Sequence, residues 1–236
     1  MKKKLIAVIS GASSGIGKEV SILLAENGYH VILLSRKIKL LKRISNKIKK
    51  NGGLSDYFKC DISNYINLKN VKKKIDKIGE VDIVINNAGV GLFSKLEEIK
   101  YADWMLQINV NLTGSFLISQ AFLKNMKKRK EGSIVFINSI AGKYGFPFSA
   151  AYVASKFGLR GLADSMRNEL REDNIRVISI YPGAVDTPFW KDKELDFDTK
   201  KMLDCKDVAS AIMNAIKANK NTVYEDLVIR GISGNL

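Results

Sequence analysis

Short apolar segments alternate along this chain with longer segments whose apolar residues recur every three or four positions. The apolar segments are rich in Ile and Val and span residues 4–10, 30–35, 81–86, 133–138 and 175–181, with a weaker one at 54–59. The helical segments span about 16–27, 37–50, 64–78, 102–128, 150–172 and 206–218. Because unbroken apolar runs of this length suit strands buried on both faces, the alternation predicts βα units around a parallel sheet.

The chain is expected to form one domain over residues 1–236. Its 46% hydrophobic content is enough for a sizeable core, and no linker, repeat or low-complexity segment divides the sequence. Pro147, Pro182 and Pro188 all fall between the predicted elements. We therefore predict a single α/β domain.

The N-terminal sequence and the two cysteines favour a cytoplasmic protein. The N-terminal "MKKKLIAVIS" carries an apolar run of about six residues, whereas a secretory signal needs roughly 7 to 15. No stretch approaches the ~20 apolar residues of a membrane span, so no membrane association is expected. Cys60 and Cys205 are far apart and suggest neither a disulfide framework nor a metal site.

The formal net charge of +15 is compatible with nucleic acid, an anionic membrane or an acidic protein partner. The lysines, however, are scattered over every polar segment and do not gather with aromatic residues. We interpret the charge as a solvated surface and predict no nucleic-acid partner.

A glycine-rich turn follows the first apolar segment, in "SGASSGIGKEV". Its spacing, G-x-x-x-G-x-G, differs from the generic G-x-G-x-x-G fingerprint, but it lies between a predicted strand and a predicted helix, where such a turn is informative. Gly11 permits the tight turn, Gly15 lets the backbone approach a pyrophosphate, and Gly17 allows close helix packing. The alternative is a flexible turn without a ligand.

The end of the second apolar segment indicates which dinucleotide is bound. Ser35 and Arg36 stand there, about 18 residues after Gly17. A carboxylate for a ribose 2′-hydroxyl is absent, and a guanidinium that can pair with a 2′-phosphate is present. We predict NADP, as NADPH, unless Arg36 is an ordinary surface residue.

Two Tyr-x-x-x-Lys pairs occur, and composition alone predicts roughly one by chance. Tyr65 and Lys69 lie in a lysine-rich exposed helix. Tyr152 and Lys156 follow a strand that ends near Ser139, and at positions i and i+4 of a helix they face the same way. Since catalysis in open α/β sheets occurs at the carboxyl ends of strands, we select Tyr152 and Lys156.

The chain resembles the short-chain dehydrogenase/reductase family over about residues 5–190. The motifs that carry the resemblance occur in family order: "SGASSGIG" (10–17), Asp61, "NNAG" (86–89), Asn111 in "NVNLTG", Ser139, "YVASK" (152–156) and "PGAVDT" (182–187). Ser10 stands where the family usually has threonine, and Asn109 competes with Asn111 for one motif position. The resemblance implies a Rossmann fold: a doubly wound parallel sheet of about seven strands with helices on both faces.

A catalytic tetrad is also implied by the resemblance. In it Tyr152 transfers the proton, Ser139 holds the substrate oxygen, Lys156 binds the nicotinamide ribose and tunes Tyr152, and Asn111 anchors a proton-relaying water. A free tyrosine titrates near ~10, and we expect Lys156 and the positive ring of the oxidised cofactor to lower the pKa of Tyr152.

Further cofactor contacts follow from the same match. Asp61 and Ile62 are placed near the adenine and Asn87 on the adenosine side, while Val185 and Thr187 are placed near the nicotinamide carboxamide. The neighbouring motif residues complete the predicted set: Ser13, Ser14, Ile16, Ala88, Gly89, Pro182 and Gly183. A short lid at about 188–203 and an apolar substrate pocket are expected, the latter walled by Phe93, Phe146, Phe189 and Trp190.

Three functions stay open at this point. The favoured one is an NADP-dependent carbonyl reductase or secondary alcohol dehydrogenase acting on a small molecule. The second is a 3-oxoacyl carrier-protein or CoA reductase, in which "KKRK" (127–130), Arg167 and Arg171 form a basic rim for an acidic carrier. The third is a nonenzymatic dinucleotide-binding regulator. The family resemblance implies a homodimer or homotetramer built on the helices at 102–128 and 150–172.

Overall fold

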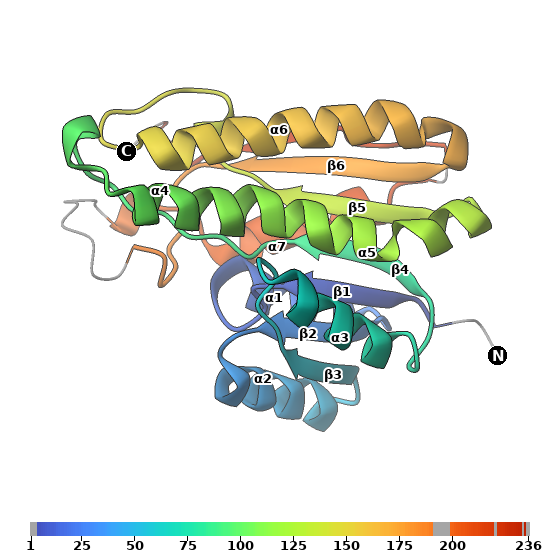
Figure 1. Cartoon of the computed structure of the whole chain (residues 1–236). Helices are drawn as coiled ribbons and strands as arrows, with labels where there is room; N and C mark the ends of the chain where they lie inside the picture. The colour runs from blue at the N-terminus through green and yellow to red at the C-terminus, as the bar shows by residue number, and fades with distance from the viewer. Residues whose placement is uncertain (1–3, 191–198, 220, 233, 235–236) are drawn as a thin grey trace.

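The protein is described here by a computed structural model that covers residues 4–190, 199–219, 221–232 and 234. Its centre is a parallel seven-stranded sheet in the order β3-β2-β1-β4-β5-β6-β7 (Figure 1). The strands are β1 Ile6–Ser10, β2 His30–Ser35, β3 Leu54–Lys59, β4 Val81–Asn86, β5 Gly132–Ile137, β6 Ile175–Pro182 and β7 Asp226–Ile229. The doubly wound Rossmann-type sheet that the sequence predicted is therefore confirmed.

Within these residues, seven α-helices connect the strands and cover both faces of the sheet. They are α1 Gly15–Glu26, α2 Ile38–Lys50, α3 Tyr65–Ile75, α4 Tyr101–Gln107, α5 Gly114–Arg129, α6 Ala150–Leu170 and α7 Cys205–Ile216. The buried side chains of α1, α2 and α7 form one apolar core against the sheet, and those of α3, α5 and α6 form the other. The central strands β1, β4 and β5 are buried throughout, as their continuous apolar sequences require.

The order of the strands fixes where a ligand can bind. From β1 the chain proceeds to β2 and β3 on one side and then returns to β4 on the other. The loops that follow β1 and β4 therefore diverge, and they leave a crevice at the carboxyl edge of the sheet.

The predicted helix at 102–128 is interrupted. A π-helical turn at Ile108–Thr113 separates α4 from α5, and Asn111 lies in this turn. The seventh strand, β7, had no predicted segment of its own; as an edge strand it exposes Asp226 and Val228 and half-buries the residues between and after them. Residues 191–198 of the predicted lid lie outside the described part of the chain, while Leu203 bridges to Val185.

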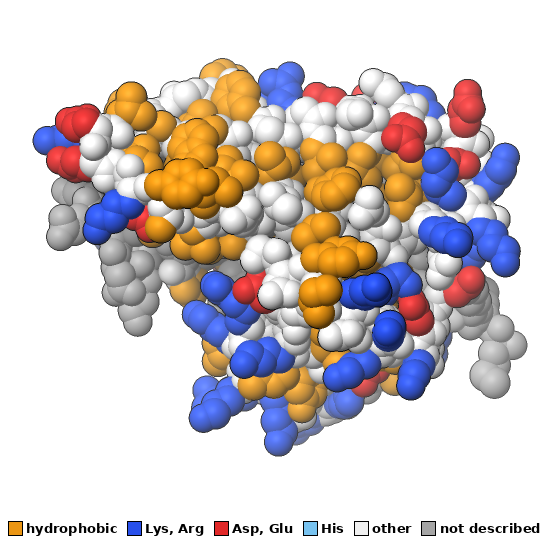
Figure 2. Space-filling view, viewed as in Figure 1, with side chains coloured by type: hydrophobic (Ala, Val, Ile, Leu, Met, Phe, Trp, Pro, Cys, Tyr) orange, Lys and Arg blue, Asp and Glu red, His pale blue; other side chains and the backbone are white. Residues whose placement is uncertain are grey.

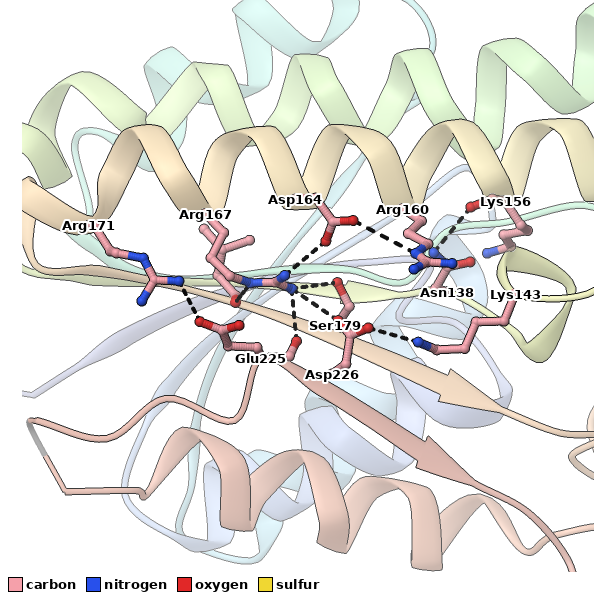
Figure 3. Close-up of polar contacts among 11 residues, drawn as sticks. Asn138, Lys143, Lys156, Arg160, Asp164, Arg167, Arg171, Ser179, Glu225 and Asp226 are labelled. Atoms are coloured by element: carbon pink, nitrogen blue, oxygen red, sulfur yellow. Dashed lines mark hydrogen bonds and ion pairs between the residues drawn. The ribbon is translucent and has the colours of Figure 1, made fainter.

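A polar network joins α6 to the edge strand (Figure 3). The buried guanidinium of Arg167 donates to the backbone oxygen of Glu225 at 2.9 Å and pairs with Asp164 at 2.8 Å and Asp226 at 3.1 Å. Asp226 also accepts a 2.8 Å bond from Lys143, in the loop that follows β5. The network therefore connects the helix of the Tyr152 and Lys156 pair to β7 and to one wall of the crevice.

Candidate functional site

A cavity of about 660 Å3 occupies the crevice at the carboxyl ends of the strands. Every predicted cofactor residue except Gly17 lines it, and so do all the predicted substrate residues. Asn111 is the predicted catalytic residue that does not. Side chains spread over almost the whole sequence thus converge on one site.

The glycine turn has the form that a dinucleotide requires. Gly11 and Gly15 have φ values of +65° and +54°, a region that L side chains rarely adopt. A Cβ on Gly11 would lie 2.7 Å from the Cα of Ala88, and one on Gly15 would lie 3.0 Å from the Thr187 side chain. Ser14 makes no side-chain cap to α1, so the first amides of this helix are available to an anion in the cavity.

A set of hydrogen bonds ties the glycine turn to the end of β4. The Ser10 hydroxyl accepts from the amides of Asn87 and Ala88 at 3.0 and 3.1 Å. The Asn87 amide group in turn donates to the backbone oxygens of Ser10 and Gly11, both at 3.1 Å. Gly17 lies beneath this amide, where a Cβ would collide with it. Asn87 therefore both lines the cavity and fixes the turn, a second contribution that the sequence did not reveal.

Two cationic side chains line the cavity next to the end of β2. Arg36 and Lys37 follow β2, are exposed and line the cavity. The Ser35 hydroxyl donates to Ser13 at 2.9 Å and accepts from the amide of Lys37 at 3.1 Å, which holds this corner in place. Lys37 was missed by sequence reasoning, although it directly follows Arg36.

Tyr152, Lys156 and Ser139 meet in the cavity. Ser139 follows β5 and accepts from the amide of Ala141 at 3.1 Å, while Tyr152 and Lys156 lie on the first turns of α6. The Lys156 ammonium donates to the backbone oxygen of Ile137 at 2.9 Å and lies 5.7 Å from the centre of the Tyr152 ring. Tyr152 and Lys156 thus lie on one face of α6, and Ser139 faces them from the segment after β5.

Burial shifts the pKa values of this pair in opposite directions. It raises the pKa of Tyr152 to about 12, against the smaller lowering effect of a hydrogen bond with Ser139. It lowers the pKa of Lys156 to about 8. The protein groups alone therefore keep Tyr152 protonated near neutrality, and do not produce the lowered pKa that we expected with an oxidised cofactor present.

Two asparagines next to the site hold its backbone segments by hydrogen bonds. Asn111 is fully buried; its side chain accepts from the amide of Val90 and donates to the oxygen of Val90, both at 2.8 Å, and donates to Ser155 at 2.9 Å. Asn138, which sequence reasoning missed although it adjoins Ser139, accepts from the Ser139 amide at 2.9 Å. The role of Asn111 in a proton relay stays a prediction.

Aromatic rings wall the side of the cavity next to Tyr152. Phe93 contacts the rings of Tyr152, Phe189 and Trp190, with centroid distances of 5.7, 6.3 and 6.1 Å. Phe189 also contacts Tyr152 at 5.7 Å and Trp190 at 5.0 Å. Phe146 lines the same cavity. These are the residues that the sequence predicted for the substrate.

Metal-binding groups and membrane-spanning helices are absent from the described residues. No three His, Cys, Asp or Glu side chains gather there in a group suited to a metal ion. Among the described helices, none combines the length and apolar character that a membrane span requires.

Comparisons with known proteins agree with this geometry. The family described as short chain dehydrogenase matches residues 5–197. A sepiapterin reductase of Chlorobaculum tepidum is 33% identical, with 99% of this chain and 98% of the relative covered. A 3-oxoacyl-[acyl-carrier-protein] reductase of Thermotoga maritima is 35% identical over 78% of this chain and 75% of its own. An alcohol dehydrogenase of the archaeon Thermococcus sibiricus, complexed with 5-hydroxy-NADP, superposes with a TM-score of 0.92 at 30% identity, over 99% of both chains.

Proposed function

The chain belongs to the short-chain dehydrogenase/reductase family of oxidoreductases, and from this premise we propose that it is an NADP(H)-dependent carbonyl reductase or secondary alcohol dehydrogenase. The observation that carries the proposal is the meeting of Tyr152, Ser139 and Lys156 in one cavity with the glycine turn. A nonenzymatic regulator would not need a tyrosine, a serine and a lysine placed together beside the dinucleotide site.

The residues present fit NADP(H). The open amides at the start of α1 suit its pyrophosphate, and the Gly11 and Gly15 positions leave room that a Cβ would fill. Arg36 and Lys37 supply two cations for the 2′-phosphate, with no carboxylate at the end of β2. Structures related to this chain have been solved with NADP, among them a metagenomic short-chain oxidoreductase with 30% identity and a TM-score of 0.85.

The side chains of this protein perform the proton chemistry. When bound, the nicotinamide exchanges a hydride with the substrate carbon. Ser139 holds the substrate oxygen, and Tyr152 donates its proton to that oxygen during reduction. The pKa of about 12 keeps this proton in place at neutral pH, and the Lys156 ammonium beside the ring favours the phenolate left behind. At neutral pH Tyr152 is therefore in the protonation state that carbonyl reduction requires.

A free carbonyl compound is favoured over a carrier-bound one. The basic rim considered for a carrier lies where α5 and α6 end, at the edge of the sheet opposite the cavity (Figure 1). Lys127 pairs there with Asp173 at 3.2 Å, and Arg129 pairs with Glu80 at 3.0 Å. A carrier docked on these residues would not face the cavity. The similarity to the Thermotoga reductase keeps 3-oxoacyl thioesters as the second candidate.

A turnover screen tests the proposal. Purified protein is assayed for NADPH oxidation with free ketones and aldehydes, with acetoacetyl-CoA and with acetoacetyl carrier protein. We expect free carbonyls to be reduced at least as well as the thioesters, with weak salt dependence. A strong preference for carrier-bound substrate that falls as salt rises to ~0.2 M would promote the second candidate. NADPH binding without turnover of any substrate would favour the regulator.

A further inference from the structure

The aromatic rings beside Tyr152 form one connected cluster, which we call the ring cluster: Phe93, Tyr152, Phe189 and Trp190. Phe93 comes from the loop after β4, Tyr152 from α6, and the other two from the segment after β6. The cluster therefore assembles from three separate parts of the chain, and one of its rings carries the hydroxyl assigned to proton transfer.

The ring cluster is fixed in place by polar contacts at its outer side. The Trp190 indole donates to the backbone oxygen of Val185 at 3.0 Å, and the amide of Phe189 donates to the Thr187 hydroxyl at 3.3 Å. Both anchors lie in the segment predicted to contact the nicotinamide. These two hydrogen bonds hold Phe189 and Trp190 next to the segment that is predicted to contact the nicotinamide.

The cavity lining beside the ring cluster is mainly apolar. Among the described residues, the charged side chains of the lining are Arg36, Lys37 and Asp61, which follow β2 and β3, and Lys156, whose ammonium lies 5.7 Å from the centre of the Tyr152 ring. Phe93 and Phe189 contact the Tyr152 ring, so they lie beside the place where a carbonyl oxygen held by Tyr152 and Ser139 would sit. An apolar substituent on that carbonyl would bury its surface against these rings.

Resting on the proposed function, we propose that the substrates are aryl ketones, in which an aromatic ring is attached to the carbonyl carbon and packs against the ring cluster. The cluster presents both ring faces and ring edges: Phe93 lies nearly parallel to Trp190, at 9°, while Phe189 meets Trp190 edge-on at 85°. Such arrangements favour aromatic over aliphatic groups of equal size by roughly 2- to 12-fold for each good ring contact.

Matched pairs of ligands test the proposal. Acetophenone and cyclohexyl methyl ketone have similar size, but only the first is aromatic. Their kcat/KM values are measured with NADPH for the wild type, for Phe93→Leu and for Tyr65→Leu, a control at an exposed ring of α3 outside the cavity. Because the two ketones differ in intrinsic reactivity, the quantity compared is the change in the ratio between variants. We expect Phe93→Leu to lower the phenyl-to-cyclohexyl ratio at least 2-fold and Tyr65→Leu to leave it unchanged.

A binding measurement without turnover completes the test. Calorimetry compares 1-phenylethanol with 1-cyclohexylethanol on the NADPH-loaded protein, in which the alcohols cannot be oxidised. Tighter binding of the phenyl compound, lost in Phe93→Leu, supports the proposal. Equal binding of the two alcohols, or a ratio that Phe93→Leu does not change, overturns it. If no carbonyl is reduced at all, the proposed function fails, while the calorimetric comparison still decides the aryl preference.

Discussion

Single side chains in this site are governed by burial more than by neighbouring charge. Burial pushes the Tyr152 hydroxyl and the Lys156 ammonium each towards its neutral form, with pKa values of about 12 and about 8. At pH 7 Tyr152 therefore keeps its proton and Lys156 is largely charged. This is the state that donates a proton to a carbonyl oxygen.

Replacing Tyr152 by Phe should abolish most turnover. We expect kcat to fall by roughly 10²- to 10⁴-fold, because the proton donor is lost, while NADPH affinity stays near wild type because the glycine turn is untouched. Steady-state assays measure kcat, and fluorescence titration measures the affinity for NADPH. Tyr65→Phe is the control: that ring is exposed on α3, 6.0 Å from the Lys69 ammonium, and its loss should be almost silent. Similar losses in both variants would mean that the wrong pair was selected.

Carbonyl reduction should slow as the pH rises through the titration of Lys156. A lysine whose pKa is lowered to about 8 is charged below that pH and neutral above it. Since the charged form stabilises the developing phenolate, kcat should be constant at low pH and decline above about pH 8. The profile of kcat from pH 6 to 10 with saturating NADPH measures this. A rate that increases over the same range would contradict the assigned role of Lys156.

Arg36→Leu should weaken NADPH far more than NADH. Loss of a charge-assisted contact to the 2′-phosphate, ~1.5 to 3 kcal/mol, corresponds to roughly 10- to 150-fold in Kd. Lys39→Leu removes an equal charge three positions further on, in the first turn of α2 and outside the cavity lining, and it should change both affinities little. Equal effects of Arg36→Leu on the two cofactors would remove the basis for NADP preference.

At the scale of elements, the periodicity of apolar residues predicts the helices and strands that local sequence determines. It misses features that depend on contacts between residues far apart in the sequence. The six apolar segments correspond to β1–β6. The five strong ones are strands that are buried over most of their length, whereas the weaker one, β3, is an edge strand with exposed ends. The π-helical turn was not predictable, since Asn111 is held there by Val90, 21 positions away. The edge strand β7 was missed because it is short and its apolar run is limited to Leu227–Ile229. Likewise, the sequence named Phe93 and Trp190 separately, but their parallel contact required the fold.

The junction between α6 and β7 should depend on Arg167. Arg167 is 9% exposed, and its guanidinium bridges Asp164, Asp226 and the backbone of Glu225, so Arg167→Met should leave the buried backbone contact unmade while Asp226 keeps Lys143 and Asp164 keeps Arg160. We expect a loss of ~1 to 3 kcal/mol in the free energy of unfolding, measured by urea denaturation. Arg171→Met is the matched control from the same helix end. Its side chain is 58% exposed and pairs with Glu225 alone, so the loss should stay below ~1 kcal/mol; equal losses would show that the network does not hold the junction.

The face of the molecule drawn in Figure 2 carries an apolar and a basic region. Figure 2 shows apolar side chains gathered over α4, α5 and α6, whereas lysines and arginines dominate around α2 and α3. The apolar region includes Tyr101, Leu106, Phe116 and Phe157, of which Tyr101 is 78% exposed. Contiguous apolar surface of this kind is typical of an interface between protein chains.

The last prediction is that the protein forms a homodimer or homotetramer through α4–α6. Phe116 and Phe157, each more than 40% exposed, project from neighbouring helices, and their burial against a second copy would remove apolar surface from water. Light scattering at micromolar concentration should therefore give at least twice the chain mass of 26.3 kDa. Phe157→Lys places a charge in this face and should shift the assembly towards smaller species. Ile66→Lys, at a site 63% exposed on α3, introduces the same charge outside the face and should leave the mass unchanged. A wild-type monomer, or an equal response to both substitutions, would exclude this face as the interface.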